Sequence, residues 1–307
     1  MEDRQSFPFC YLLVGIPFIF FLIFWVYVNI SSIFISFQDF RGNFTLQNFK
    51  DVFTAFVDKD IYGWNLSQIM WRTFRLWLYV NLLCLLPIAL SSYVLYKKIW
   101  GHYVFRVIFM IPTVISGIVF TLITKNMVAL NGPVIMLLNK LGWETPMEVQ
   151  ITGSLLTAPD TSFVTIVLIN LIPHLVGFNI IIQGAFARLP EELFEVGRLE
   201  GMGFFREFFT VSLPLIWPTL TVSLISLLAT MFTVEGGVFI YTKGAYNTGT
   251  MGFYLYWLTL KLSEAAGVET VNYGYPAAIG LVITCITVPI VLICKKLMGK
   301  FQETIEY

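Results

Sequence analysis

Charged residues are scarce in this chain of 307 residues, where they make up 12% of the sequence against a hydrophobic share of 57%. Soluble domains carry about 25% charged residues. The composition therefore excludes an ordinary soluble domain and predicts an integral membrane protein. The nineteen basic and nineteen acidic residues cancel. Because no net charge is left to attract a polyanion, nucleic acid is not expected among the partners.

Reactive side chains are also few. The only histidines are His102 and His174, and neither they nor the four cysteines have the spacing of a metal site, a redox pair or a catalytic triad. The phosphate-binding pattern G-x-x-x-x-G-K-[ST] is absent. The sequence therefore predicts that the chain is not an enzyme, binds no metal or cofactor, and does not hydrolyse ATP itself.

Long apolar runs are what the sequence has in abundance. A bilayer core about 30 Å thick needs about 20 apolar residues of helix. Six runs are interpreted as spans: 9–37, 76–96, 107–124, 163–187, 215–234 and 277–294. The stretch "MGFYLYWLTL" at 251–260 is too short to cross and is rich in Tyr and Trp, which favours an interfacial helix on the outer side. The prediction is an all-α polytopic membrane protein with six transmembrane helices.

The basic residues fix the predicted orientation. With the N-terminus inside, segments 1–10, 97–106, 188–214 and 295–307 are cytoplasmic and hold ten of the nineteen Lys and Arg residues. This inward bias agrees with the positive-inside rule, so both termini are expected in the cytoplasm. The predicted organisation is an N-terminal helix with an outer segment (1–75), a membrane core (76–296) and a cytoplasmic tail (297–307).

One outer segment has a clear local pattern. In "GPVIMLLNKLG", Pro133 stands where a helix can begin and Gly142 follows where one can end. The pattern predicts one short amphipathic helix outside the membrane.

The segment 188–214 is the longest predicted cytoplasmic loop, and charge is concentrated in it. Pro190 favours the first turn of a helix, Glu191 and Glu192 complement its positive end, and Gly201 offers a left-handed residue to stop it. The stretch "FFREFF" then predicts a second short helix, which ends where Leu213-Pro214 opens the fifth span. We expect two helices hinged at glycine on the membrane surface.

Polar residues within the spans suggest a cavity, because such groups are costly in lipid. Ser223, Ser226, Thr230 and Thr233 follow helical steps in the fifth span, and Asn170, His174 and Gly177 do so in the fourth. The same pattern is also typical of surfaces where membrane helices pack, so both interpretations stay open. Glu235 is expected at the outer end of the fifth span, as an interface charge or an acceptor for sugar hydroxyls.

The loop carries a motif with a known counterpart. Its order is Glu195-Val196-Gly197, three residues, Gly201, nine residues, and Val211-Ser212-Leu213-Pro214. This resembles the EAA-loop signature of ABC importer permeases, with Val196 and Gly197 in place of two alanines. The stretches "FRVIFMIPTVISGIVFTLI", "ALNGPVIMLLNKLG" and "VFIYTKGAYNTGT" extend the resemblance. They are similar to the carbohydrate branch, and within it to the first of two paired permeases, akin to the maltose and glycerol-phosphate permeases.

The resemblance implies a fold, a function and a set of partners. The fold is the type I ABC importer transmembrane domain in a bacterial cell membrane. The partners are a second permease in a heterodimer, two ATP-binding subunits that use ATP and Mg, an extracellular solute-binding protein, membrane lipid and a carbohydrate cargo. The residues implied in coupling to the ATPase are Glu195, Gly197, Glu200, Gly201, Phe204, Phe205, Leu213 and Pro214. For the substrate path the resemblance supports Asn170, at its distance before Glu195, and places Thr230 and Met231 where other sugar contacts would fall. The other candidates for the path come from their positions in the spans: His174, Gly177, Ser226, Thr233 and Glu235.

Two other function classes remain as alternatives, and each requires features that the sequence has in small measure. A proton- or sodium-coupled transporter acting alone would need an acidic residue deep in a span, and the predicted spans hold acids only near their ends. A membrane-bound enzyme would need reactive residues that the chain lacks. Among cargoes, glycerol phosphate or a polyol is the nearest alternative to an oligosaccharide, but a phosphorylated cargo would favour cations in the spans.

Overall fold

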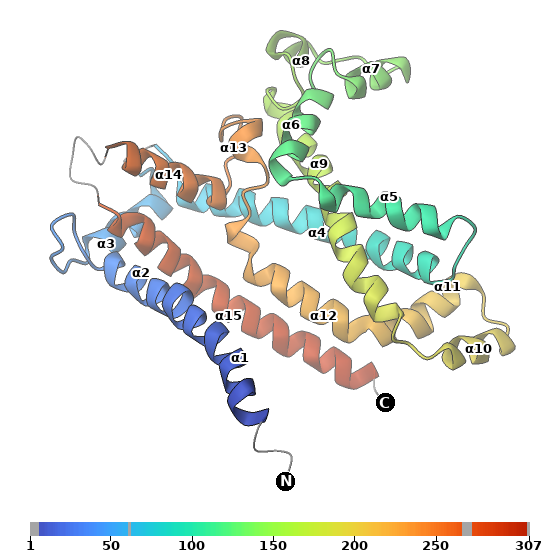
Figure 1. Cartoon of the computed structure of the whole chain (residues 1–307). Helices are drawn as coiled ribbons and strands as arrows, with labels where there is room; N and C mark the ends of the chain where they lie inside the picture. Colours follow the sequence, from blue (N-terminus) through green and yellow to red (C-terminus); the bar gives the residue numbers. More distant parts are fainter. Residues whose placement is uncertain (1–5, 61–62, 266–271, 306–307) are drawn as a thin grey trace. The chain divides into compact units, whose positions relative to one another are not determined.

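The computed structural model describes residues 6–60, 63–265 and 272–305, and helices carry most of them (Figure 1). The first half contains α1 (Ser6–Phe21), the π-helical turn η1 (Leu22–Tyr27), α2 (Val28–Ser36), α3 (Gln47–Val57), α4 (Leu66–Tyr96), α5 (His102–Val114), α6 (Gly117–Met127), α7 (Pro133–Lys140) and α8 (Met147–Thr152). The second half contains α9 (Pro159–Phe186), α10 (Glu191–Leu199), α11 (Phe204–Glu207), the π-helical turn η2 (Phe208–Ser212), α12 (Leu213–Ala229), the 3-10 turn η3 (Met231–Thr233), α13 (Val238–Tyr241), α14 (Met251–Ala265) and α15 (Gly274–Ile305). In the described ranges β-pairing is limited to two isolated bridges, Gln38–Phe44 and Ala129–Ser154.

Five helical stretches of the described chain are long and apolar enough to cross a membrane: Leu13–Ser36, Leu66–Tyr96, Pro159–Phe186, Phe204–Ala229 and Gly274–Lys300. This makes the chain a multi-pass membrane protein. A sixth crossing requires α5 and α6 to act together. α14 has 15 residues and stays below spanning length, in agreement with the short helix expected at 251–260.

The stretch predicted as one span at 107–124 is instead a bent pair. α5 and α6 meet at an angle of 101°, with Ile115 in extended backbone between them. Pro112 removes a backbone donor inside α5, and Gly117 at the start of α6 has weak helix propensity. An apolar run shows that a segment favours lipid, but it does not show that its helix is straight.

The chain divides into two compact units. The first contains Met1–Ser67 and Leu255–Ile286, and the buried Asn48 connects its segments. The Asn48 amide donates to the carbonyls of Ser36 (3.0 Å) and Gln38 (2.8 Å), and its own oxygen accepts from Asn272 (2.9 Å). A side chain can join three segments in this way because an amide both donates and accepts.

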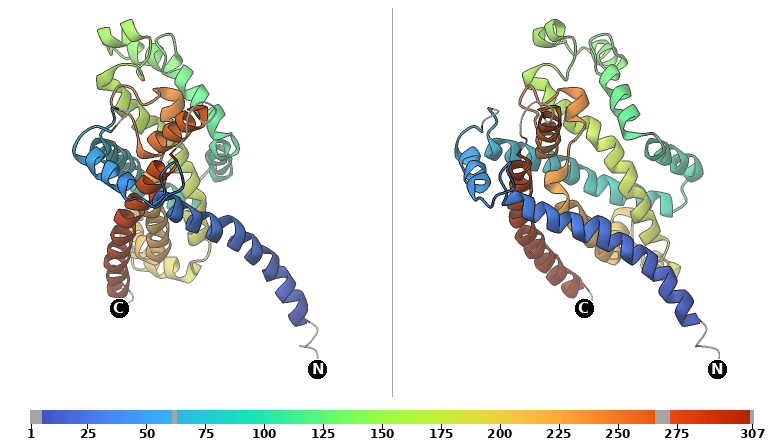
Figure 2. Two further views of the ribbon diagram at one scale, coloured as in Figure 1. Left: turned by 90° about the vertical axis from the view of Figure 1, so that its left-hand side faces the viewer. Right: turned by 60° about the vertical axis from the view of Figure 1, so that its left-hand side comes forward.

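The second unit contains Gln68–Tyr254 and Thr287–Tyr307. Within it, α7 and α8 lie beyond one end of the long helix α9, and the loop that carries α10 and α11 lies at the other end (Figures 1 and 2). α9 contacts both α5 and α12. The two functional features predicted for this unit, a loop at one end and polar positions inside the spans, can therefore be described separately.

Candidate functional site

The loop 188–214 begins with α10, which ends as its sequence predicts. Gly201 has a φ of +71°, a left-handed conformation that L side chains rarely adopt. The amide of Met202 donates to the carbonyl of Gly197 (3.0 Å), and that of Glu200 donates to Val196 (3.0 Å), so the last turn is closed by hydrogen bonds. The prediction of a helix stopped by a left-handed Gly201 is confirmed.

α10 has an inner and an outer face. Phe194 is 3% exposed and Gly197 is buried, and these two lie on the inner face. The outer face has exposed apolar side chains at every third position, with exposed acids between them. The apolar side chains are Leu193, Val196 and Leu199, and the acids are Glu192 and Glu195 on the helix and Glu200 in the turn directly after it. One helix thus packs on its own protein by one side and presents a mixed acidic and apolar surface on the other.

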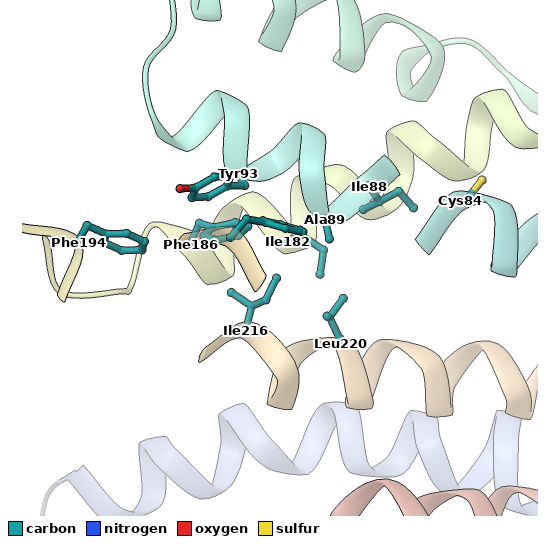
Figure 3. Close-up of a cluster of buried hydrophobic side chains, with 10 residues drawn as sticks. Cys84, Ile88, Ala89, Tyr93, Ile182, Phe186, Phe194, Ile216 and Leu220 are labelled. Atoms are coloured by element: carbon teal, nitrogen blue, oxygen red, sulfur yellow. The ribbon is translucent and has the colours of Figure 1, made fainter. Parts of the chain in front are cut away.

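Aromatic rings hold the inner face in place. Phe194 from α10 and Phe208 from η2 join a buried cluster with Tyr93 of α4 and Phe186 of α9. The ring of Tyr93 lies 5.0 Å from that of Phe204 and 5.3 Å from that of Phe208, and the rings of Tyr96 and Phe194 are 5.1 Å apart. Figure 3 shows Ile216 and Leu220 pointing from α12 toward the same cluster. The loop is therefore packed against three long helices.

An ion pair reinforces this packing. The ammonium of Lys97, just past the end of α4, contacts the carboxylate of Glu207 in α11, and their side chains are 15% and 5% exposed. The same ammonium lies 4.9 Å from the ring centre of Phe194 and 5.4 Å from that of Tyr93, distances at which cations are attracted to aromatic faces. We call these five residues, Tyr93, Lys97, Phe194, Glu207 and Phe208, the loop anchor. A buried pair of this kind fixes geometry more than it adds stability.

The second half of the loop differs from the expectation. "FFREFF" does not form a separate helix; α11, η2 and α12 run as one helical stretch from Phe204 to Ala229. Pro214 has no backbone N–H to donate. The residues just before it, Phe208–Ser212, form a π-helical turn, which accommodates the missing hydrogen bond without breaking the helix. The fifth span therefore extends directly into the loop.

The predicted coupling residues fall into two groups. Glu195, Glu200, Gly201, Phe204 and Phe205 are exposed, whereas Gly197 is buried and Leu213 and Pro214 are half-buried at the start of α12. A side-chain carbon at Gly197 would lie 3.6 Å from the sulfur of Met202, an ordinary contact, so alanine fits there as in the EAA signature. The sequence analysis does not predict the loop anchor, for which the local signal is weak: Tyr93 and Lys97 are four residues apart at the end of α4.

Asn170 lies beside a cavity of about 200 Å³. Its amide donates to the carbonyl of Ile166 (2.8 Å) and to that of Gly236 (3.1 Å), so it joins α9 to the turn before α13. Thr121 and Tyr241 also line the cavity, and its described lining contains no charged side chain. The hydroxyl of Thr121 donates to the carbonyl of Gly117 (2.7 Å) and that of Tyr241 pairs with Thr124 (2.7 Å), so the lining offers ligand hydroxyls mainly the acceptor oxygens of Asn170, Thr121 and Tyr241.

His174 and Gly177 lie elsewhere. The Nε2 of His174 is 3.2 Å from the Oδ1 of Asn81, in a smaller cavity of about 20 Å³ that Ser223 also lines. Gly177 is exposed and lines neither cavity. The three polar positions predicted to share one face of the fourth span are therefore divided between different surroundings.

The hydroxyl stripe of the fifth span is interrupted. α12 ends at Ala229, so Thr230 is its C-cap and Thr233 lies in η3. Ser226 donates to Val222 (3.0 Å), Thr230 to Ser226 (3.3 Å) and Thr233 to Thr230 (2.8 Å), all carbonyls of the same segment. Met231 is buried. The helix predicted to run to residue 234 is shorter, and it is followed by η3 and by a turn in which Gly236 and Gly237 adopt left-handed backbone.

Glu235 organises that turn. Its carboxylate accepts from the backbone amide of Gly237 (2.8 Å) and from that of Phe239, at the start of α13. Its carbonyl accepts from Thr250 (3.1 Å). A carboxylate at the positive end of a short helix is favourable, so Glu235 supports the wall of the cavity at Gly236 and Gly237.

Together these features define a multi-pass helical membrane protein with a mainly apolar, uncharged cavity that three polar side chains line, and a two-faced charged helix anchored at one end. No family model matches the chain. The arabinooligosaccharides transport system permease protein AraP of Bacillus subtilis (strain 168) is 28% identical over 301 residues, which cover 92% of this chain and 86% of AraP. The probable ABC transporter permease protein YurN of the same strain is 22% identical over 308 residues and covers 99% of each chain.

Structural comparison shows the fold. A chain from the crystal structure of a bacterial ABC transporter involved in the import of the acidic polysaccharide alginate superposes with a TM-score of 0.76 at 18% identity, over 97% of this chain and 98% of that chain. The homologues of this protein are thus permease subunits of ABC sugar transporters, and its fold is that of the transmembrane component of an ABC importer.

Proposed function

We propose that this chain is the permease subunit of an ATP-driven importer that moves a neutral carbohydrate, an oligosaccharide in particular, into a bacterial cell by alternating access. The observation that carries the proposal is the two-faced helix α10, which is fixed inward by the loop anchor and acidic and apolar outward. The EAA-type spacing and the named relatives support it.

The outer face of α10 fits an ATPase partner. Its three apolar side chains suit a hydrophobic groove, and its three acids suit basic residues around such a groove. Leu199 is 88% exposed, a large apolar side chain left in water unless a partner covers it. Two ATP-binding subunits would use ATP and Mg, and this chain would contribute the contact rather than the hydrolysis.

The loop anchor gives the movement a path. When the ATPase closes and displaces α10, Phe194 and the Lys97–Glu207 pair transmit the displacement to α4 and α9. Because α11 and α12 form one helical stretch, the fifth span moves with the loop. Rigid connection to three long helices is what a switch between inward-open and outward-open states requires. A second permease and an extracellular solute-binding protein would complete the importer.

The cavity at Asn170 supports a neutral cargo. Sugar hydroxyls can donate to the oxygens of Asn170, Thr121 and Tyr241, and the described lining holds no Lys or Arg to bind a phosphate. We expect Asn170→Leu to lower sugar uptake at least tenfold while the importer still assembles. Asn29→Leu is the matched control, because the Asn29 amide also donates to a carbonyl one turn back, Trp25 at 2.7 Å. Equal uptake by both variants would remove Asn170 from the cargo path.

Two glycines provide a matched test of the coupling. Gly201 follows α10 and Gly142 follows α7, their φ angles are +71° and +86°, and both have open space where a side chain would go. Arginine therefore introduces the same backbone strain at either position. We expect Gly201→Arg to abolish ATP-driven uptake of labelled neutral oligosaccharides and Gly142→Arg to retain at least half of it.

Co-purification completes the test. The wild-type chain, extracted from its host membrane, should retain a protein that contains the phosphate-binding pattern this chain lacks, and the Gly201→Arg chain should retain much less of it. Transport by the isolated chain without ATP, or normal uptake by Gly201→Arg, would contradict the proposal in favour of an ion-coupled transporter.

A further inference from the structure

A third cavity, of about 260 Å³, lies beside the turn between α4 and α5. This turn is at the same end of the unit as the loop 188–214, because Lys97 in the turn contacts Glu207 in α11. Three basic side chains line the cavity, Lys98, His102 and Arg106, together with Tyr96, Tyr103 and Gln183. The described lining contains no acid, so the cavity has one sign of charge.

The positive charge of this cavity is not neutralised by neighbouring side chains. In the described part of the chain Lys98 and Arg106 form no ion pair, whereas the adjacent Lys97 does. α5 begins at His102 with no acid in its first turn and no side-chain cap, so the positive end of the helix dipole adds to the field. The Nδ1 of His102 lies 3.1 Å from the carbonyl of Ile99, which orients the ring. The lining thus favours an anion with several acceptor oxygens.

The surroundings of the cavity are those of a membrane surface. Trp100, in the turn itself, is 96% exposed, and Tyr103 on the cavity wall is 73% exposed. Trp and Tyr settle at the level of lipid headgroups. Farther along α5 most exposed side chains are apolar, among them Val107, Ile108 and Ile111. A free phosphate ion would need only the basic side chains of the cavity. A phospholipid would in addition contact the aromatic side chains at its edge and the apolar side of α5.

We propose that this cavity binds the phosphate-bearing headgroup of an anionic phospholipid. Lys98 and Arg106 pair with the phosphate, Tyr103 donates a hydrogen bond to the headgroup, and the acyl chains lie along the apolar side of α5. Basic pockets between helices at the cytoplasmic side of membrane proteins suit such headgroups. Because Lys98 follows Lys97, a bound lipid would adjoin the loop anchor. The proposal does not depend on the identity of the cargo.

The test uses the full-length chain purified in neutral detergent. It is titrated separately with short-chain phosphatidylglycerol, short-chain phosphatidylcholine and inorganic phosphate, and bound molecules are counted by native mass spectrometry. We expect one retained phosphatidylglycerol per chain, at least tenfold weaker binding of phosphatidylcholine, and at least tenfold weaker binding by the double variant Lys98→Gln/Arg106→Gln. The variant Lys98→Arg/Arg106→Lys, which keeps both charges, should bind within threefold of the wild type.

A charge-matched control distinguishes binding in this cavity from a non-specific attraction of the anionic lipid to basic residues elsewhere on the chain. Lys295 and Lys296 are exposed on α15, and Lys295→Gln/Lys296→Gln removes the same charge as the test variant. This control should bind phosphatidylglycerol as the wild type does. Equal loss in both double variants, no loss in the cavity variant, or equally tight binding of inorganic phosphate would each overturn the assignment to a lipid headgroup.

Discussion

The two ends of the second unit each contain a short helix that is followed by a left-handed glycine. The two helices are attached to the rest of the unit in different ways. α7 ends before Gly142, and α10 ends before Gly201. The segment of α7 and α8 is closed by backbone hydrogen bonds at its own base, from Leu130 to Gly153 (2.8 Å) and from Leu155 to Val128 (3.2 Å). α10 is instead attached through side chains, by Phe194 and the other residues of the loop anchor.

This difference indicates what each end can transmit. A segment closed on itself can meet a partner without moving the spans, because its base holds its own geometry. A helix whose side chains are packed among α4, α9 and α12 moves those helices when it moves. We infer that α10 serves coupling and that α7 offers a surface for contact alone. Three variants test this distinction between the two ends of the unit.

Phe208→Ala should have the largest effect. Phe208 is 1% exposed in the aromatic cluster, and truncating a buried Phe costs about 3–5 kcal/mol. The measurement is thermal unfolding of the purified chain in detergent, together with protease sensitivity of the loop 188–214. Phe205→Ala, at an exposed position three residues earlier, is the control and should change unfolding by less than about 0.5 kcal/mol. Equal effects of the two variants would show that the aromatic cluster does not hold the loop.

Lys97→Met should have the second-largest effect. Removing the cation leaves the carboxylate of Glu207 buried without its partner, which costs about 3 kcal/mol. The double variant Lys97→Met/Glu207→Met has no unpaired charge and should recover at least half of the lost stability. A double-mutant cycle on unfolding free energy measures the coupling. Strictly additive losses would show that the pair is not part of the loop anchor.

Leu137→Ser on α7 should have the smallest effect. Leu137 is exposed, and surface substitutions change stability by less than about 0.5 kcal/mol. We expect the ATPase to co-purify in normal amount, since α7 lies at the other end of the unit from α10. Loss of the ATPase from this variant would remove the distinction between the two ends.

Features that depend on a few neighbouring residues could be predicted from the sequence. Pro133 begins α7, Gly142 and Gly201 adopt left-handed backbone after their helices, and five apolar runs form long helices. Each depends on the conformational limits of proline or glycine, or on hydrophobic length. The prediction of six spans stays a prediction, because the sixth requires the bent pair of α5 and α6 to cross together.

Features that depend on distant residues could not be predicted. Lys97 and Glu207 are 110 residues apart, and nothing near either residue indicates its partner. The prediction of a separate helix for "FFREFF" was wrong because a π-helical turn accommodates Pro214 without ending the helix. The predicted hydroxyl stripe requires a helix that continues through Thr233, but α12 ends at Ala229. Sequence periodicity shows which residues would share a face, provided that the helix continues.

The most direct measurement places a photo-activated cross-linking residue at Val196, on the outer face of α10, and at Leu137 on α7 as the control. Both side chains are exposed, and they lie at opposite ends of the unit. Irradiated membranes from the native host are analysed by mass spectrometry for proteins that carry a phosphate-binding loop. The account predicts a cross-link from position 196 to such an ATP-binding subunit and none from position 137. An ATP-binding subunit cross-linked equally from both positions, or from neither, would contradict it.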